Sequence, residues 1–296
     1  MSAAPARDAF GPALAAMARK DAPAFGPAAF RAYLDEHDVA AETTTTIAVD
    51  TLRRLAPSLR DSGAMVFRLG VAPGSNAIVF ALAKVATGWS DYFLLDAEVF
   101  GGLRPKSFSP RGNSHHFDLL SQLAGLSGST LVALAASTGV LAEALQLDDG
   151  QTQPVPAAGQ GLFTFPVLAR PGLPVWTHRR GPVEIDGAFI ARRRGTDTVF
   201  VVAARTGRTL DSLAKHKLAY AAQAVLGALP PGVAVVPVYL RVLRKATQLL
   251  CYVAECTAWR ASDPPAPVSA LAVRRAACFL LPRPERDPTL PLNLVQ

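Results

Sequence analysis

The sequence predicts an α/β protein in three parts: an N-terminal α/β region over residues 1–110, a helix-turn-helix or winged-helix-like module over 111–165, and a C-terminal α/β domain over 166–296. Three observations predict this division. Strand-like apolar runs follow a helical start, small residues are spaced as in a helix-turn-helix, and a strand–turn–strand–helix pattern runs from Val183 to Tyr220. Half of the 296 residues are apolar and 18% are charged, a composition that supports a large core and excludes a disordered chain.

The N-terminal region shows no pattern typical of a catalytic site. Residues 1–60 carry apolar residues at helical spacing, and residues 64–100 contain three apolar runs typical of strands. The acids Asp91, Asp96 and Glu98 stand near strand ends, where we expect solvated loop positions. The basic, turn-rich stretch 101–114 is the expected boundary with the next part.

Residues 117–147 predict three short helices with the spacing of a helix-turn-helix. Small Ala135 lets two helices approach, Gly139 permits a sharp turn, and Leu145 packs the third helix back onto the first. The third helix would be a recognition helix with Gln146 as its base reader. Since it carries Glu143 and neither Lys nor Arg, packing or dimerisation is an equally open role for this module.

The stretch from Val183 to Tyr220 organises the C-terminal domain. Glu184 and Asp186 are two residues apart, so both side chains leave the same face of a strand. Ala203 and Arg205 share a face of the following strand in the same way. A phosphodiester is cleaved when carboxylates hold a divalent cation and a cationic side chain steadies the phosphate and the attacking water. A plain hairpin with a solvated, Arg-rich tip is the alternative for the same pattern.

The three segments 183–190 (Val-Glu-Ile-Asp-Gly-Ala-Phe-Ile), 201–207 (Val-Val-Ala-Ala-Arg-Thr-Gly) and 215–220 (Lys-His-Lys-Leu-Ala-Tyr) resemble the core of restriction-endonuclease-like proteins, the PD-(D/E)xK superfamily. The resemblance covers about a third of the chain. It implies an αβββαβ core, a helix over 210–226, and binding of double-stranded DNA with Mg²⁺ as the cofactor of any hydrolysis. It also implies a homodimer, because a duplex has two strands to cut.

The same resemblance implies a degenerate catalytic motif. The first metal-binding acid of the family would fall on Asp186, the second on Ala203, and the lysine on Arg205. Alanine offers no metal ligand, and an arginine, with a pKa above about 12, gives up no proton. Glu184 could replace the missing acid, so Asp186 and Glu184 are the predicted Mg²⁺ ligands and Arg205 the predicted phosphate-stabilising group.

The distribution of charge supports a polyanionic partner. The net charge is +7, and residues 170–217 alone hold ten Lys or Arg against four Asp or Glu. A basic concentration of this kind attracts nucleic acid. The residues that we expect to contact DNA are Arg179, Arg180, Arg192, Arg193, Arg194, Lys215, Lys217 and Gln146.

Three functions remain open at this point. The first is a DNA-binding restriction-endonuclease-like protein, impaired or inactive as a nuclease. The second is a helix-turn-helix transcriptional regulator with a C-terminal effector or partner domain, and the third is a structural partner in a larger defence complex. The chain shows neither a signal peptide nor an apolar run long enough to span a membrane, and we expect its three cysteines to be buried thiols in the cytoplasm.

Overall fold

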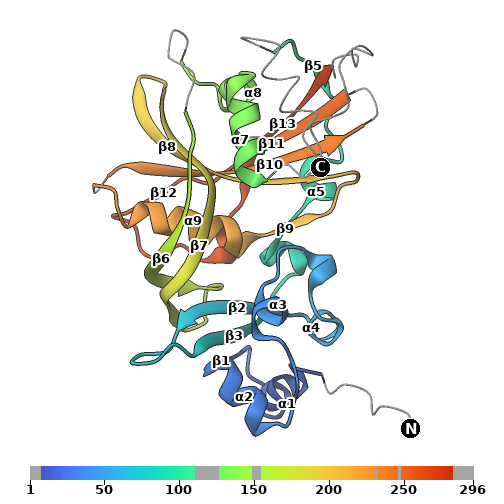
Figure 1. The fold of residues 1–296 in the computed structure, drawn as a ribbon, viewed down its shortest axis with the longest axis vertical. Coiled ribbons are helices and arrows are strands. Elements are labelled where there is room, and N and C mark those ends of the chain that lie inside the picture. The colour runs from blue at the N-terminus through green and yellow to red at the C-terminus, as the bar shows by residue number, and fades with distance from the viewer. Residues whose placement is uncertain (1–7, 111–126, 149–154, 231, 246–247, 283–296) are drawn as a thin grey trace, which may run out of the picture.

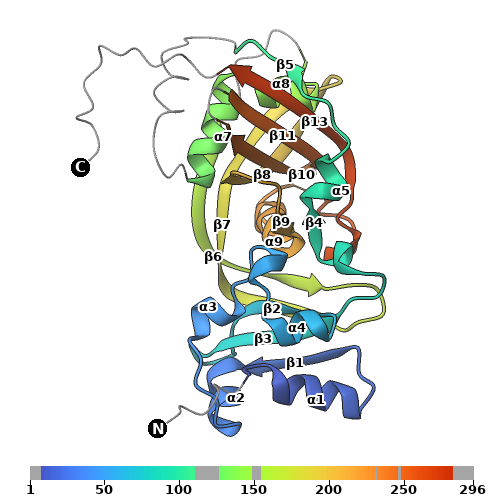
Figure 2. The same cartoon turned by 90° about the vertical axis from the view of Figure 1, so that its right-hand side faces the viewer.

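The computed structural model of the chain describes residues 8–110, 127–148, 155–230, 232–245 and 248–282. A large mixed sheet, with helices on both faces, forms the C-terminal part, and a small antiparallel sheet with short helices forms the N-terminal end (Figures 1 and 2). The predicted mixed α/β class is confirmed. None of the helices within the described residues combines the length and the hydropathy that crossing a bilayer demands.

The strands follow one path, β1-β3-β2-β7-β8-β10-β11-β13-β5, with β6 paired to β7 and β12 paired to β10, while β4 and β9 pair separately. In this path β1, β3 and β2 form the small antiparallel sheet, which joins the main sheet through one parallel pair, Gly70↔Arg179 of β2 and β7. Their bounds are β1 Ala24–Ala29, β2 Ala64–Val71, β3 Ile78–Lys84, β4 Phe93–Leu95, β5 Lys106–Ser107, β6 Ala157–Leu168, β7 Val175–Arg193, β8 Thr196–Gly207, β9 Ser212–Ala214, β10 Ala234–Arg244, β11 Gln248–Cys256, β12 Trp259–Arg260 and β13 Val273–Pro282.

The helices are short, and most of them lie in the N-terminal region. Their bounds are α1 Gly11–Arg19, α2 Phe30–Glu36, α3 Thr43–Ile47, α4 Pro57–Asp61, α5 Asp96–Phe100, α7 Gly128–Ser137, α8 Val140–Leu145 and α9 Lys215–Leu226, with single 3₁₀ turns at Leu52–Arg54, Trp89–Asp91 and Val268–Ala270. The helix predicted over 210–226 therefore starts later, at Lys215, because residues 212–214 form strand β9 instead.

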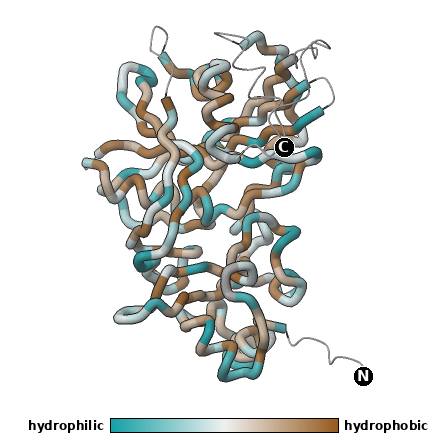
Figure 3. The backbone as a smooth tube through the Cα atoms, in the orientation of Figure 1, coloured by the Kyte–Doolittle hydropathy of each residue, from teal (hydrophilic) through white to brown (hydrophobic). Residues whose placement is uncertain are grey.

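Successive side chains of β8 point to opposite faces of the sheet, and each face has its own hydrophobic core. Val201 and Ala203 belong to the core on the α9 face, whereas Val202 and Ala204 belong to the core under α7 and α8. A strand covered on both faces needs apolar residues at successive positions, and this is the physical reason for the long apolar runs in β8 and β10. Figure 3 shows hydrophilic residues at the β7–β8 turn and hydrophobic residues along the strands behind it.

The predicted division into three parts differs from the arrangement in space. The core of the α9 face continues without a break into the N-terminal region, and α5 and β5, predicted in the first part, pack on β13 of the last. Helices α7 and α8 cover one face of the main sheet, and β6 pairs along β7. The described residues of the predicted 111–165 module therefore belong to the C-terminal part, as helices packed on its sheet and as one of its strands. Residues 111–126 and 149–154 of this module lie outside the described residues.

Asp96 is fully buried, so its predicted place on a solvated loop is wrong. Its carboxylate accepts hydrogen bonds from the Tyr239 hydroxyl at 2.9 Å and from the Asp211 amide at 2.7 Å, and it lies 3.2 Å from the Arg241 guanidinium. Arg241 in turn donates to the carbonyl of Thr209 at 2.6 Å. Burial raises the pKa of Asp96, while the Asp211 amide and Arg241 favour the charged form. The prediction of buried thiols is confirmed for Cys251, Cys256 and Cys278.

Removing the Asp96 carboxylate leaves the buried Arg241 charge without its counterion. We therefore expect Asp96→Ala to lower the free energy of unfolding by about 3–5 kcal/mol, measured by urea denaturation at neutral pH. Glu98→Ala is the matched control, because Glu98 lies on the same helix and is exposed, and its substitution should change stability by less than about 0.5 kcal/mol. Equal effects of the two substitutions would contradict the assignment.

Candidate functional site

The candidate site lies where β7 separates from β8. The two strands pair antiparallel from Arg193↔Thr196, next to the turn, to Gly187↔Val202. Asp186, the neighbour of Gly187 on the side away from the turn, is the first residue of β7 outside this pairing. The Asp186 carboxylate occupies this point, accepting a hydrogen bond from the Ala204 amide at 2.8 Å. Arg205 Nη1 lies 3.7 Å from the same oxygen. The predicted juxtaposition of Asp186 and Arg205 is therefore present.

Helix α7 begins directly against Asp186. A Cβ atom on Gly128, the first residue of that helix, would overlap the Asp186 carboxylate, so only glycine permits this approach. The amide groups at a helix N-terminus carry a partial positive charge that stabilises a nearby carboxylate. The Ser127 side chain caps the helix by accepting a hydrogen bond from the Thr130 amide at 3.2 Å.

Asp186 experiences opposing effects on its ionisation. Asp186 is only 8% exposed. Burial raises the pKa of its carboxyl group, and the nearby Glu184 carboxylate makes a smaller contribution in the same direction. The Ala204 amide, Arg205 and Lys217 favour the ionised form. The charge of Asp186 is thus held by a backbone donor and a guanidinium.

Asp50 is a site residue that the sequence analysis missed. It follows α3 in the chain, and its Oδ1 atom lies 2.8 Å from Lys217 Nζ and 3.9 Å from Arg205 Nη2. Burial opposes its ionisation, but Lys217 and Arg205 together hold the pKa of Asp50 below its usual value. Arg205 consequently lies between two carboxylates from distant parts of the chain. No local pattern marks Asp50, which only the tertiary fold brings to Asp186.

The first turn of α9 supplies the other side of the site. Lys215, His216 and Lys217 open this helix, where the helix dipole disfavours positive charge. Asp50 offsets this cost at Lys217. Lys215 points elsewhere: it is buried and donates to the carbonyl of Ser269 at 3.1 Å, so this side chain, which we expected to contact DNA, lies in the interior.

A small cavity of about 80 Å³ connects these groups at the junction of the N-terminal region with the main sheet. Its lining includes the predicted residues Glu184, Asp186, Ala203 and Arg205, and in addition Arg68, His178, His216, Lys217 and Tyr220. Counting Asp50 beside it, three carboxylates face three cationic side chains, so the charges of the site balance. Glu184 is exposed, whereas Ala203 is buried in the cavity wall.

The inner end of the cavity is aromatic and polar. The Tyr220 ring contacts the rings of Phe165, His178 and His216. Burial, with a further contribution from Lys217, lowers the pKa of His216 to about 3, so this imidazole is neutral at pH 7. Within the described residues, His216 Nδ1, the Tyr220 hydroxyl and Arg68 Nε are buried without a hydrogen-bond partner.

The donor set does not fit a divalent metal in this arrangement. Among the described residues, no three His, Cys, Asp or Glu side chains are grouped so that they could hold a metal ion. Ala203 brings a methyl group to the place where a further carboxylate would be needed, and the oxygens of Asp186 and Asp50 already face Arg205 and Lys217. The Mg²⁺ site predicted on Asp186 and Glu184 remains without a third protein ligand.

The predicted DNA-binding arginines form two separate groups at the ends of β7. Arg179 and Arg180 are exposed near the junction with β2, whereas Arg192 and Arg194 are exposed at the β7–β8 turn. At about 3.3 Å per residue, the twelve steps from Arg180 to Arg192 correspond to roughly 40 Å along the strand. Arg193 is part of a structural ion pair, with its Nη1 atom 2.7 Å from Glu255 Oε1.

The sharp turn that we predicted between helices α7 and α8 is present, but α8 offers little exposed surface with which to contact DNA bases. Gly139 has a φ of 83°, as the sharp turn requires. Helix α8 ends at Leu145, and its apolar residues are buried against β11 and β13. Gln146 follows the helix in a left-handed conformation with φ 52° and is exposed.

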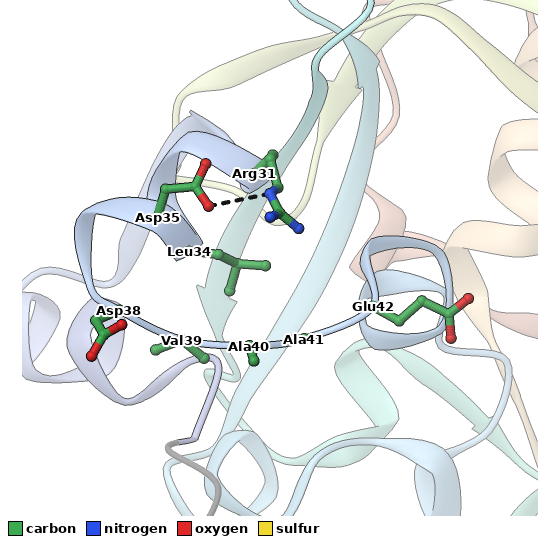
Figure 4. A pocket seen from close by; sticks show the side chains of 8 residues that line it. All are labelled: Arg31, Leu34, Asp35, Asp38, Val39, Ala40, Ala41 and Glu42. Carbon is green, nitrogen blue, oxygen red and sulfur yellow. Dashed lines mark ion pairs between the residues drawn. The ribbon is translucent and has the colours of Figure 1, made fainter.

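A second hollow lies at the N-terminal end of the molecule, around residues 31–42. Figure 4 shows that its acidic side chains point apart: Asp35 faces Arg31, with 3.2 Å between Oδ1 and Nε, while Asp38 and Glu42 lie at opposite ends of the segment. These side chains do not converge on a common point.

Comparison of the chain with protein-family models, with curated proteins and with solved structures finds no match.

Gly128 and Asp186 should be energetically coupled. Gly128→Ala should lower the free energy of unfolding by about 1–3 kcal/mol, since the added methyl group meets the Asp186 carboxylate. In an Asp186→Ala background the same substitution should cost much less, giving a coupling energy of at least about 0.5 kcal/mol in a double-mutant cycle measured by urea denaturation. Gly102→Ala, at a glycine with open space around it, is the control. Strict additivity would contradict the contact.

The neutral His216 predicts a pH dependence of stability. Its folded-state pKa lies below the unfolded value, so the unfolded chain binds a proton first and stability falls as pH drops below about 6.5 towards about 3. Its contribution to the slope approaches about 1.4 kcal/mol per pH unit in that window.

The measurement is urea denaturation at a series of pH values for the wild type and for His216→Phe, which keeps a ring against Phe67 and Tyr220. The variant should show a shallower slope. His37→Phe is the control, because His37 also contacts a tyrosine ring but is only half-buried. An unchanged slope in His216→Phe would refute the assignment.

Proposed function

We propose that the chain is a DNA-binding protein built on a restriction-endonuclease-like core whose hydrolytic site is impaired. The observation that carries the proposal is the position of Asp186 beside Arg205 and Ala203 at the point where β7 and β8 separate. It is the arrangement that the resemblance implies, with alanine in place of the second acid.

The connectivity of the strands supports the proposal. Strands β6, β7 and β8 form an antiparallel meander, α9 crosses over the sheet, and β10 returns parallel to β8. With α7 and α8 preceding β6, the order of elements agrees with an αβββαβ unit. Such a core presents its acidic and basic side chains from adjacent strands on one face.

The chemistry of the site supports binding rather than cleavage. Arg205 and Lys217 neutralise Asp186 and Asp50, leaving no concentration of negative charge to attract a divalent cation. Phosphodiester cleavage by a relative with the full motif would use Mg²⁺ to generate a nucleophile from water. In this chain the Arg205 guanidinium faces Asp186 and Asp50, so contacts with phosphates would come from exposed arginines outside the cavity.

The exposed arginines at the two ends of β7 would provide the electrostatic contacts with the DNA backbone. Phosphate contacts of this kind give sequence-independent affinity that falls steeply with salt. A regulator that reads bases through a recognition helix receives less support, because α8 is short and turns its apolar residues into the core.

The proposal is tested by fluorescence anisotropy with labelled duplex DNA over a range of salt concentrations. The wild type should bind at low salt, and Arg192→Gln with Arg194→Asn should reduce the salt slope by about 2, one unit per phosphate contact. Arg19→Gln with Arg60→Gln makes the same change in net charge at exposed positions of the N-terminal region and should leave the slope unchanged. Absence of binding at low salt would refute the proposal.

The nuclease-like ancestry is tested separately by restoring the missing acid. Ala203→Glu with Arg205→Lys should gain DNA cleavage in Mg²⁺ or Mn²⁺, and adding Asp186→Ala should abolish it. If the double variant folds and binds DNA but does not cleave it, the proposal of a nuclease-like core is refuted. The proposal of DNA binding would still stand on its own measurement.

A further inference from the structure

Among the strands that the structure describes, β6 forms an edge of the main sheet. It pairs with β7 along one side, from Ala157↔Ala188 to Leu168↔Val175, and no other strand in the described part of the chain bonds to its second side. Figure 2 shows β6 running along the outer side of β7. Seven of its twelve residues are exposed, most of them between Ala157 and Leu162, so this stretch is uncovered on its faces as well.

The sequence of β6 lacks the usual protection of an edge strand. Natural proteins guard such edges with charged side chains, prolines or pronounced bulges. Residues 157–168 (Ala-Ala-Gly-Gln-Gly-Leu-Phe-Thr-Phe-Pro-Val-Leu) contain no charged residue, and the single proline, Pro166, stands near the end that packs against α9. The register of β6 against β7 shifts near both ends of the exposed part, between Ala157 and Gly159 and between Phe163 and Phe165, and the stretch between these two shifts is regular and open to pairing.

The exposed large apolar side chains concentrate on the same two-stranded ribbon. Leu162 on β6 is 64% exposed, and Val155, just before the strand, is 87% exposed. On β7, Val175 and Ile190 are 57% and 64% exposed. Leu162 and Val155 lie on the unpaired strand and just before it, which is typical of an interaction surface, whereas Val175 and Ile190 lie toward the two ends of β7.

We propose that β6 pairs antiparallel with β6 of a second copy of the chain, through residues 157–164 and about a two-fold axis. Two-fold symmetry places identical strands antiparallel to each other, so the edge is complementary to itself. A strand without charged residues brings no like charges into opposition when it meets its copy, although the chain as a whole carries +7. Pairing would also remove Leu162 of both copies from water.

The pairing would join two sheets into one and bring two candidate sites together. Gln160 of β6 lies opposite Glu184 of β7, at the mouth of the site. Three strand spacings separate the two β7 strands in such a dimer, so they would lie roughly 15 Å apart. The pairing itself does not depend on the proposed function, and it is measured without DNA.

The test is sedimentation equilibrium of the full chain over a wide range of concentrations. The wild type should form a dimer, and Leu162→Lys should weaken it by at least about tenfold, because a charged side chain then lies inside the paired stretch, opposite Gly159 of the other copy, and apolar contact is lost. Ile190→Lys is the matched control: Ile190 has the same 64% exposure but lies beyond the end of the β6–β7 pairing, and its substitution should leave the dimer intact.

Hydrogen exchange locates the interface independently. The backbone amides within 157–164 that do not bond to β7 should exchange more slowly at concentrations where the dimer forms and faster on dilution. A wild type that stays monomeric at every soluble concentration overturns the proposal, as does equal weakening by the two lysine substitutions. Slow exchange of these amides in the monomer would assign the edge to another segment of the same chain, and it too would overturn the proposal.

Discussion

The burial of a carboxylate at Asp186 constrains everything around it. A charge withdrawn from water needs donors and counterions, and here it receives the Ala204 amide, the Arg205 guanidinium and the N-terminus of α7. The first two come from β8 and the third is α7 itself, so β7, β8 and this helix meet at one carboxylate. Gly128 follows from the same constraint, since any larger residue would overlap the carboxylate.

A chain of opposite charges extends from this point into the N-terminal region. Arg205 also faces Asp50, and Asp50 holds Lys217 at the start of α9. The ion pairs therefore join the loop after α3 to the main sheet, beside a hydrophobic core that the two regions share. A separable N-terminal domain is difficult to reconcile with this arrangement, because its removal would leave Lys217 and Arg205 short of a counterion.

Much of the C-terminal architecture could be predicted because its signals are local. Alternation in β7 and β8 placed Glu184, Asp186, Ala203 and Arg205 around one cavity. The left-handed Gly139 was also readable, since few other residues adopt its conformation. Burial was the weak point: Asp96 and Lys215 look like surface residues in sequence, and only their partners, Tyr239, Arg241 and the Ser269 carbonyl, make an interior position tolerable.

The sequence by itself determined the α/β class, the strands that carry the acids and arginines, and an excess of positive charge, because strand periodicity and composition are properties of neighbouring residues. Tertiary structure alone decided that Asp50 joins the site, that α8 packs into the sheet, and that the arginines of β7 form two groups far apart. The physical reason is that counterions and covering layers are supplied by segments distant in the chain. No local pattern of residues predicts these contacts between distant segments.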